Sequence, residues 1–218
     1  MPLLAAVVAL VLSQIAPYFT GPLGGLGSGI LDFIEKVVFG FAFGAAIIQA
    51  DHVIRAKAGA FDTAWEEARS KAGGIILAVV GFWFVLYVAQ FAGTLIGLIA
   101  QIVLMLLAAF FLIYTIPAAA IGGLPGSLAI GGSIRAVRAD LLGAAILAIA
   151  FFVLFMYVPP AIVATFAGTL MLPSSLGPLW GSIVVMLVLA LLQAVALAYL
   201  AFPFANQYED VAFHTSIY

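Results

Sequence analysis

A stretch without any formal charge runs from Gly73 to Gly122 and consists mostly of apolar residues. As one α-helix it would be about 75 Å long, because each residue adds 1.5 Å. That is more than twice the thickness of a bilayer's hydrocarbon core, which is about 30 Å. The stretch therefore predicts two membrane-spanning helices joined by a turn near Gln90–Thr94, and it favours an all-α, polytopic membrane protein.

The composition excludes several classes of function. Hydrophobic residues make up 67% of the 218 residues and charged residues 7%, whereas soluble domains carry about 25% charged residues. A net charge of −2 argues against nucleic acid as a partner. The chain has no Cys, which excludes thiolate metal sites and iron–sulfur clusters, and its two histidines, His52 and His214, lie outside the apolar runs. We expect no cofactor and no metal.

The apolar runs predict six spanning helices. The first is read as a retained span, since no cation precedes Lys36 as a signal peptide would need. Pro159-Pro160 is expected to kink or end the fifth span and Pro203 to end the sixth, because proline lacks a backbone donor. The six runs are Leu3–Phe19, Ile30–Ala50, Gly74–Ala89, Leu95–Ala119, Leu141–Val158 and Leu179–Phe202.

Two polar connections set the expected orientation. Asp51–Ala72 has one apolar stripe that includes Trp65, which predicts a short amphipathic helix in the membrane interface with Trp65 at headgroup depth. Leu124–Asp140 is the second connection, with Ser133 as the expected N-cap of a helix. If both connections and the tail are cytoplasmic, six of the seven Lys and Arg residues lie on that side. We therefore expect a plasma-membrane protein with both termini in the cytoplasm.

The sequence also contains an internal similarity. Ala64–Val88 and Ile134–Val158 share seven identities in 25 ungapped positions, and each is followed by the pentapeptide FAGTL. This favours a duplicated hairpin, with the two copies parallel about an axis along the membrane normal. Chance similarity of apolar helices is the alternative. We expect one transmembrane domain over residues 1–218, made of hairpins 1–60, 61–122 and 123–218.

Few residues are candidates for a functional site, and each has a structural alternative. Asp32, Glu35 and Lys36 begin the second span, where they form either an interfacial helix cap or a vestibule for an ion or substrate. Arg135 and Arg138 are suited to an anionic lipid headgroup or a partner, and otherwise to anchoring the cytoplasmic side.

The remaining candidates lie within the spans. Gln101 and Gln193 are polar residues inside apolar runs, suited to hydrogen bonds between helices or to a translocation path. Small residues that allow close helix packing are Gly40, Gly44, Gly93 and Gly97. No nucleophile, P-loop or dinucleotide fingerprint appears, so we do not expect an enzyme.

Two motifs carry a family resemblance. The pattern A-x-x-x-A-x-x-x-x-G enters a span at Ala64–Gly73, with a related turn at Ser133–Gly143, and the last span is followed by Pro203 and then Tyr208-Glu209-Asp210. In these features the chain resembles a set of bacterial and archaeal six-span membrane proteins, which includes the membrane domain of some glycerophosphodiester phosphodiesterases. The resemblance implies a non-enzymatic membrane module, since no catalytic residue of that membrane part can be carried over.

Two functions fit these observations. The first is a non-catalytic accessory subunit that packs against membrane lipids and other integral membrane proteins. The alternative is a channel or transporter for a small neutral or amphipathic solute, favoured by the internal similarity, the Pro159-Pro160 break and the glutamines of the spans.

Overall fold

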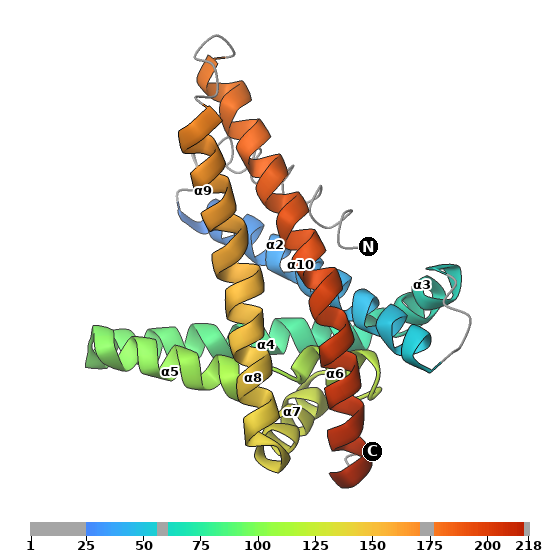
Figure 1. Ribbon diagram of the computed structural model, residues 1–218. Coiled ribbons are helices and arrows are strands. Elements are labelled where there is room, and N and C mark those ends of the chain that lie inside the picture. Colours follow the sequence, from blue (N-terminus) through green and yellow to red (C-terminus); the bar gives the residue numbers. More distant parts are fainter. Residues whose placement is uncertain (1–24, 56–60, 171–176, 216–218) are drawn as a thin grey trace.

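The computed structural model describes residues 25–55, 61–170 and 177–215, and these form helices and connections without any strand. The first predicted span, Leu3–Phe19, lies outside the described residues. The described helices (Figure 1) are α2 (Gly25–Ile54), α3 (Phe61–Ser70), α4 (Ala72–Ile96), α5 (Leu98–Phe111), α6 (Thr115–Ala120), α7 (Ser127–Ala139), α8 (Leu141–Phe151), the π-helix η1 (Phe152–Tyr157), α9 (Val158–Leu170) and α10 (Gly177–Thr215).

Five helical segments in the described part of the chain are long and apolar enough to cross a membrane. They coincide with the second to sixth apolar runs of the sequence, which confirms the all-α class. The amphipathic helix predicted between the first two of them is present as α3. The five segments are Phe33–Ile54, Ala72–Ile96, Leu98–Ala120, Leu141–Thr165 and Leu187–Ala212.

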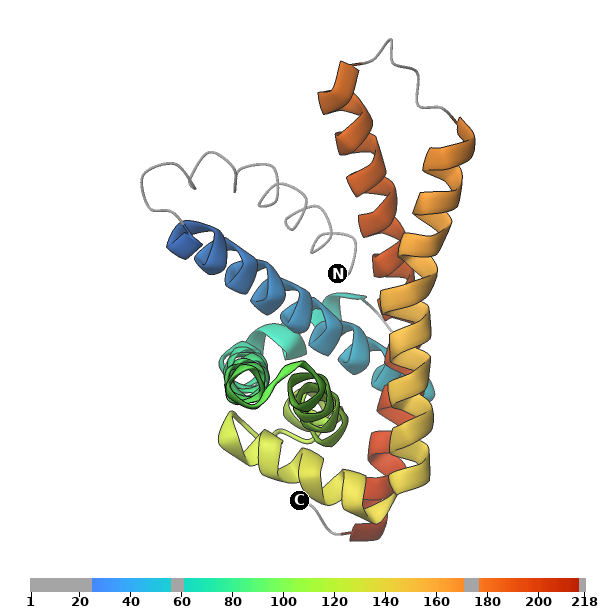
Figure 2. The same cartoon turned by 90° about the vertical axis from the view of Figure 1, so that its left-hand side faces the viewer.

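Two helical hairpins leave one common corner of the molecule in different directions. In Figure 1, α4 and α5 run side by side to the left, while the continuous helix α8–η1–α9 runs upward beside α10. Figure 2 shows α4 and α5 nearly end-on, so the two hairpins lie crosswise. The helix α2 packs against both hairpins, through α4 and α6 on one side and α10 on the other.

The helices continue through the prolines that the sequence analysis expected to kink or end them. The sequence predicted a helix end at Pro203, which is wrong, because α10 continues through Pro203 to Thr215. The residues beyond the proline hold the helix, since Phe204, Tyr208 and Ala212 are buried in the core. At Pro159-Pro160 the helix also continues, and the preceding turns widen into the π-helix η1. In membrane helices, such local π adjustments help to satisfy the backbone groups that a proline leaves without a partner.

The turn between α4 and α5 consists of a single residue, Gly97. The predicted turn at Gln90–Thr94 is wrong, because α4 extends to Ile96. Gly97 has φ 134° and ψ 166°, a backbone conformation open essentially to glycine alone. The chain therefore reverses where glycine permits it, and the more polar residues Gln90 and Thr94 stay on the helix.

The core lies where α2 crosses the other helices. Ile47 and Ile48 of α2 are completely buried. A Cβ atom on Gly40 would come within 2.6 Å of Val79 in α4, and one on Gly44 within 2.9 Å of Ile75. These two glycines therefore lie at the closest approach of α2 and α4, where a side chain would push the helices apart.

Candidate functional site

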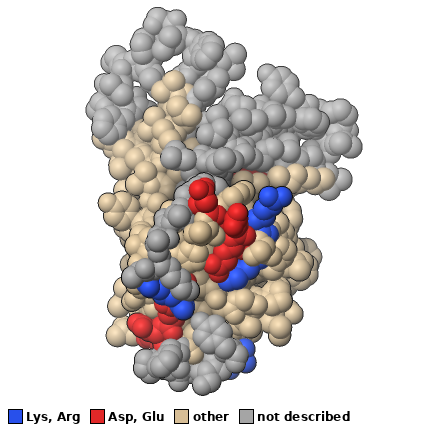
Figure 3. Space-filling view, turned by 90° about the vertical axis from the view of Figure 1, so that its right-hand side faces the viewer, with Lys and Arg blue, Asp and Glu red and all other residues tan. Residues whose placement is uncertain are grey.

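Several ionisable side chains of the described residues gather where the two hairpins meet. Figure 3 views this face, on which Lys and Arg lie next to Asp and Glu. At the end of α2, the Arg55 Nε donates to Asp51 Oδ1 at 2.8 Å. The Arg55 guanidinium also pairs with Glu209, near the end of α10. This arginine therefore ties together two helix ends that are far apart in the sequence.

A second chain of polar contacts joins α2 to α3, α4 and α6. Buried His52 has its Nε2 2.6 Å from Glu67 Oε2. The other Glu67 oxygen accepts from Lys71 Nζ at 2.7 Å, and the same amine donates to the carbonyl of Ala120 at 2.9 Å. Burial raises the pKa of Glu67, but hydrogen bonds and charge from Lys71 and His52 outweigh it, so the pKa lies below 4.5.

Asp140 forms the third connection, between α8 and α10. Its Oδ1 accepts from the backbone N–H of Gly143 at 2.9 Å and so caps the N-terminus of α8. Its Oδ2 accepts from Gln207 Nε2 of α10 at 3.0 Å. The Gly143 N–H, followed by Gln207, stabilises the ionised carboxylate and holds the pKa of Asp140 below its usual 3.8.

We call these residues the charged corner: Asp51, His52, Arg55, Glu67, Lys71, Asp140, Gln207 and Glu209. Its contacts join the ends of α2, α6 and α10 to the starts of α4 and α8. Within the described residues no three His, Asp or Glu side chains are placed to hold a metal ion. The contacts of the charged corner therefore hold the ends of several helices together. Sequence reasoning found the polar segments and the i,i+4 pair of Glu67 with Lys71, but not the pairings between residues far apart in the sequence.

The predicted interfacial residues lie on two short helices, α3 and α7. Trp65 of α3 is half-buried and meets the ring of Phe41 edge-on, with centroids 6.2 Å apart. Arg135 and Arg138 are exposed on α7 and form no ion pair with any described residue. Leu141 and Leu142, which follow in the sequence, are 56% and 74% exposed.

Ser133 does not begin a helix as predicted, since it lies inside α7 and is fully buried. Its Oγ accepts from the backbone N–H of Tyr114 at 3.0 Å and donates to the carbonyl of Phe111 at 2.8 Å. These groups flank the break between α5 and α6. Pro117 lies four residues after Ile113 in this break, where its ring and missing N–H disfavour a continuous helix.

The structure does not bring the predicted glutamines into a common polar path. Gln101 of α5 and Gln193 of α10 are partly buried, and neither side chain forms a hydrogen bond within the described part of the chain. Gly93 is buried opposite Gln101, whose Cα would lie 2.2 Å from a Cβ at Gly93. Gly97 makes the turn, and no neighbouring atom lies within 4 Å of the position of its Cβ.

A central cavity of about 140 Å³ lies between the helices, away from the charged corner. Its lining is apolar and largely aromatic, with Lys36 as its one charged residue. The Lys36 Nζ donates to the Tyr87 hydroxyl at 3.2 Å and lies 4.8 Å from the centre of the Trp83 ring. The cavity is lined by Lys36, Phe39, Gly40, Phe43, Phe82, Trp83, Ala109, Leu112, Ile113, Ile116, Phe151, Leu197 and Phe204.

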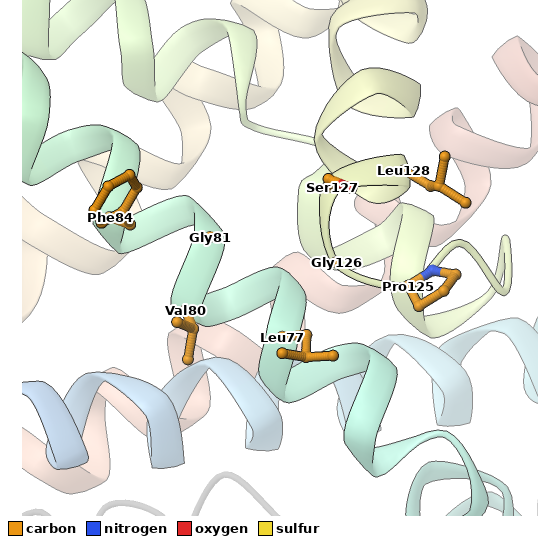
Figure 4. Close-up of a pocket in the computed structure, with 8 residues that line it drawn as sticks. All are labelled: Leu77, Val80, Gly81, Phe84, Pro125, Gly126, Ser127 and Leu128. Carbon is orange, nitrogen blue, oxygen red and sulfur yellow. The ribbon is translucent and has the colours of Figure 1, made fainter.

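An open groove of about 680 Å³ runs along the outside of α4 (Figure 4). Leu77, Val80, Gly81 and Phe84 form its α4 side, and residues 125–128 form the other. Leu77 and Phe84 are 58% and 66% exposed, and Ser127 is the one residue of the lining with a polar side chain. The groove therefore offers an apolar surface without acid or base groups.

Comparison with known proteins gives no relative for this chain: no protein-family model, curated protein or solved structure matches it.

Proposed function

We propose that the protein is a non-catalytic integral membrane subunit that packs against other membrane proteins and lipids in a larger complex. The α4–α5 hairpin carries this proposal. Helix α5 has no buried residue, and around the turn Leu95, Leu98 and Ile99 are 70–80% exposed. The hairpin thus presents a long apolar surface, without acidic or basic side chains, that the rest of the described chain leaves uncovered.

The proposal includes a topology of six spans with both termini in the cytoplasm of a plasma-membrane protein. The charged corner supports it, since the ends of α2 and α10 and the start of α8 are joined there by polar side chains. Arg69, Arg135 and Arg138 are exposed on the short helices α3 and α7 that connect the spans, in agreement with the bias of Lys and Arg toward cytoplasmic connections. The parallel repeat and the relationship to the six-span family belong to the same proposal.

Lipid contacts are proposed on α7. Arg135 and Arg138 are three residues apart, so they share one side of the helix. The exposed Leu141 and Leu142, which begin α8, follow them closely in the sequence. A cation next to an apolar residue suits the boundary between headgroups and acyl chains, where a guanidinium can bind a lipid phosphate with two hydrogen bonds.

Photocrosslinking in native membranes tests the subunit role. A photoreactive residue at Ile99 reports on the α4–α5 surface, and one at Tyr199, 74% exposed on α10, is the matched control. We expect a discrete protein adduct from Ile99, and the same partner retained after mild detergent extraction and mass spectrometry. Lipid adducts alone from Ile99, with the protein extracted as a lone monomer, would contradict the proposal.

A channel or transporter is the second candidate, and the central cavity favours it. The cavity lies at the meeting point of the apolar helices, and the charged corner closes the helix ends on one side. Flux of small solutes into proteoliposomes tests it, and Ala109→Phe, which fills the cavity, is expected to reduce the flux. Absence of flux across a broad solute panel would count against transport and leave the subunit role standing.

A further inference from the structure

The central cavity lies where α2 meets the two hairpins, so a molecule bound there would face all of them. Its wall takes Phe43 from α2, Phe82 from α4, Phe151 from α8 and Phe204 from α10. The centre of the Phe43 ring lies 6.4 Å from that of Phe151 and 5.4 Å from that of Phe204. The cavity is therefore part of the aromatic core that joins the hairpins.

Polar atoms are scarce among the side chains that line this cavity. Only Lys36 and Trp83 contain a side-chain nitrogen or oxygen atom. The Lys36 amine lies over the rings of Trp83 and Tyr87, at 4.8 and 5.5 Å from their centres, and donates to the Tyr87 hydroxyl. These contacts hold the amine against α4. A polar molecule in the cavity would lose its hydrogen bonds to water without full replacement, so the lining favours an apolar one.

The volume of the cavity limits the size of that molecule. About 140 Å³ is close to the roughly 150 Å³ of an engineered apolar cavity that takes up benzene. Protein interiors are otherwise packed as densely as organic crystals, with few voids larger than a water molecule. A cavity of this size and lining therefore suits one apolar ring or the end of one apolar chain.

We propose that the central cavity binds a neutral apolar group of about six carbon atoms. Two sources offer that chemistry: a free hydrocarbon ring of this size, and the end of the acyl chain of a membrane lipid. The proposal requires no charge or hydrogen-bonding group on the ligand, and none from Lys36. The inference concerns binding alone, so it does not depend on whether the protein is a subunit or a transporter.

Fluorescence of Trp83, which lines the cavity, reports binding directly. The chain has three tryptophans, so the Trp65→Phe/Trp180→Phe protein reports from Trp83 alone. We would titrate this protein in nanodiscs with iodobenzene and with 1-iodonaphthalene, because a bound iodine atom quenches a nearby indole. The expected result is saturable quenching by iodobenzene. Quenching by 1-iodonaphthalene should rise only linearly with its concentration, because its fused rings are too large for the cavity.

Three variants separate binding in the cavity from partition into the surrounding lipid. Ala109→Phe places a phenyl group in the cavity and should raise the half-saturating concentration of iodobenzene at least about tenfold. Ala164→Phe, at an exposed position on α9, is its matched control and should leave that concentration unchanged. Leu197→Ala, at a buried position of the lining, enlarges the cavity and should make quenching by 1-iodonaphthalene saturable. A misfolded protein would not show this gain.

Brominated lipids distinguish the two sources of the apolar group. The nanodiscs then contain phosphatidylcholine with bromine near the ends of its acyl chains, and no iodobenzene is added. If lipid chains enter the cavity, quenching of Trp83 should be weaker in the Ala109→Phe protein than in its parent. Equal quenching in the two proteins, together with saturable binding of iodobenzene, would assign the cavity to a free small molecule.

Two results would overturn the proposal. One is linear quenching by iodobenzene together with brominated-lipid quenching that Ala109→Phe does not change, because neither kind of group would then enter the cavity. The other is saturable quenching by iodobenzene that Ala109→Phe does not weaken, since the probe would then bind outside the cavity.

Discussion

At the scale of single residues, Ser133 shows how one side chain stabilises a break in a helix. Its hydroxyl serves both the N–H of Tyr114 and the carbonyl of Phe111, which lie in the interrupted segment between α5 and α6. Ser133 is fully buried, so water does not replace these bonds when the hydroxyl is lost.

We expect Ser133→Ala to lower the free energy of unfolding by about 1–3 kcal/mol, because two buried backbone groups lose their partner. Thermal or denaturant unfolding in detergent measures the loss. Ser127→Ala, at an exposed position on the same helix, is the control and should cost much less. If Ser133→Ala lowers the free energy of unfolding no more than Ser127→Ala does, the hydrogen bonds of Ser133 do not stabilise the break between α5 and α6.

The ionisation of Glu67 makes the stability of the fold depend on pH in a defined direction. Its pKa in the folded protein is below the ordinary 4.5, so its ionised form stabilises the fold. The contribution is present above pH 4.5 and is lost as the pH falls through the folded pKa. We therefore expect Glu67→Gln to lower the melting temperature at pH 7 and to differ less from the unsubstituted protein at pH 4. A difference that is constant between these pH values would contradict the assignment.

At the scale of elements, Gly97 determines how α4 and α5 form a hairpin. We expect Gly97→Ala to destabilise the protein by about 1–3 kcal/mol, because alanine is strained at a φ of 134° and a ψ of 166°. Gly131→Ala is the control, since that glycine lies inside α7 with no atom within 4 Å of its Cβ position, and it should be neutral or stabilising. Equal melting temperatures for the two variants would argue against a strained turn.

Sequence reasoning predicted the elements better than their ends. The long apolar runs identified all five described membrane-length helices, because hydropathy over about 20 residues is a local property. Pro203 was wrongly taken as a helix end, because burial of Phe204 and Tyr208 through distant contacts outweighs the missing hydrogen bond. The turn between α4 and α5 was predicted at the polar residues near Gln90–Thr94, whereas it lies at Gly97, because its backbone conformation requires a glycine.

The candidate site was predictable only in part for the same reason. Composition placed the polar segments at one end of the molecule, but the pairing of Arg55 with Glu209 joins residues 154 positions apart. The central cavity also depends on how helices distant in the sequence cross. Two of its lining residues were candidates in the sequence, Lys36 as part of a possible vestibule and Gly40 as a packing residue.

At the scale of the whole molecule, the charged corner should couple α2 to α10. A double-mutant cycle with Arg55→Gln and Glu209→Gln is expected to give a coupling of up to about 1 kcal/mol, since the Arg55 side chain is 42% exposed and partly screened by solvent. The cycle of Arg55→Gln with Glu66→Gln, an exposed residue of α3, should be additive. Additivity in both cycles would mean that the corner does not link the two helices.

The central claim is that the chain crosses a membrane with its charged corner in the cytoplasm, and labelling of single cysteines tests it most directly. The sequence has no Cys, so each introduced thiol is read without background. Ser70→Cys and Ala139→Cys lie at the charged corner, and Thr94→Cys lies near the turn of the α4–α5 hairpin; all three positions are exposed. With an impermeant maleimide on intact cells, we predict that Thr94→Cys reacts at once and the other two only after permeabilisation. Equal reaction of all three, or the reverse pattern, would contradict the account.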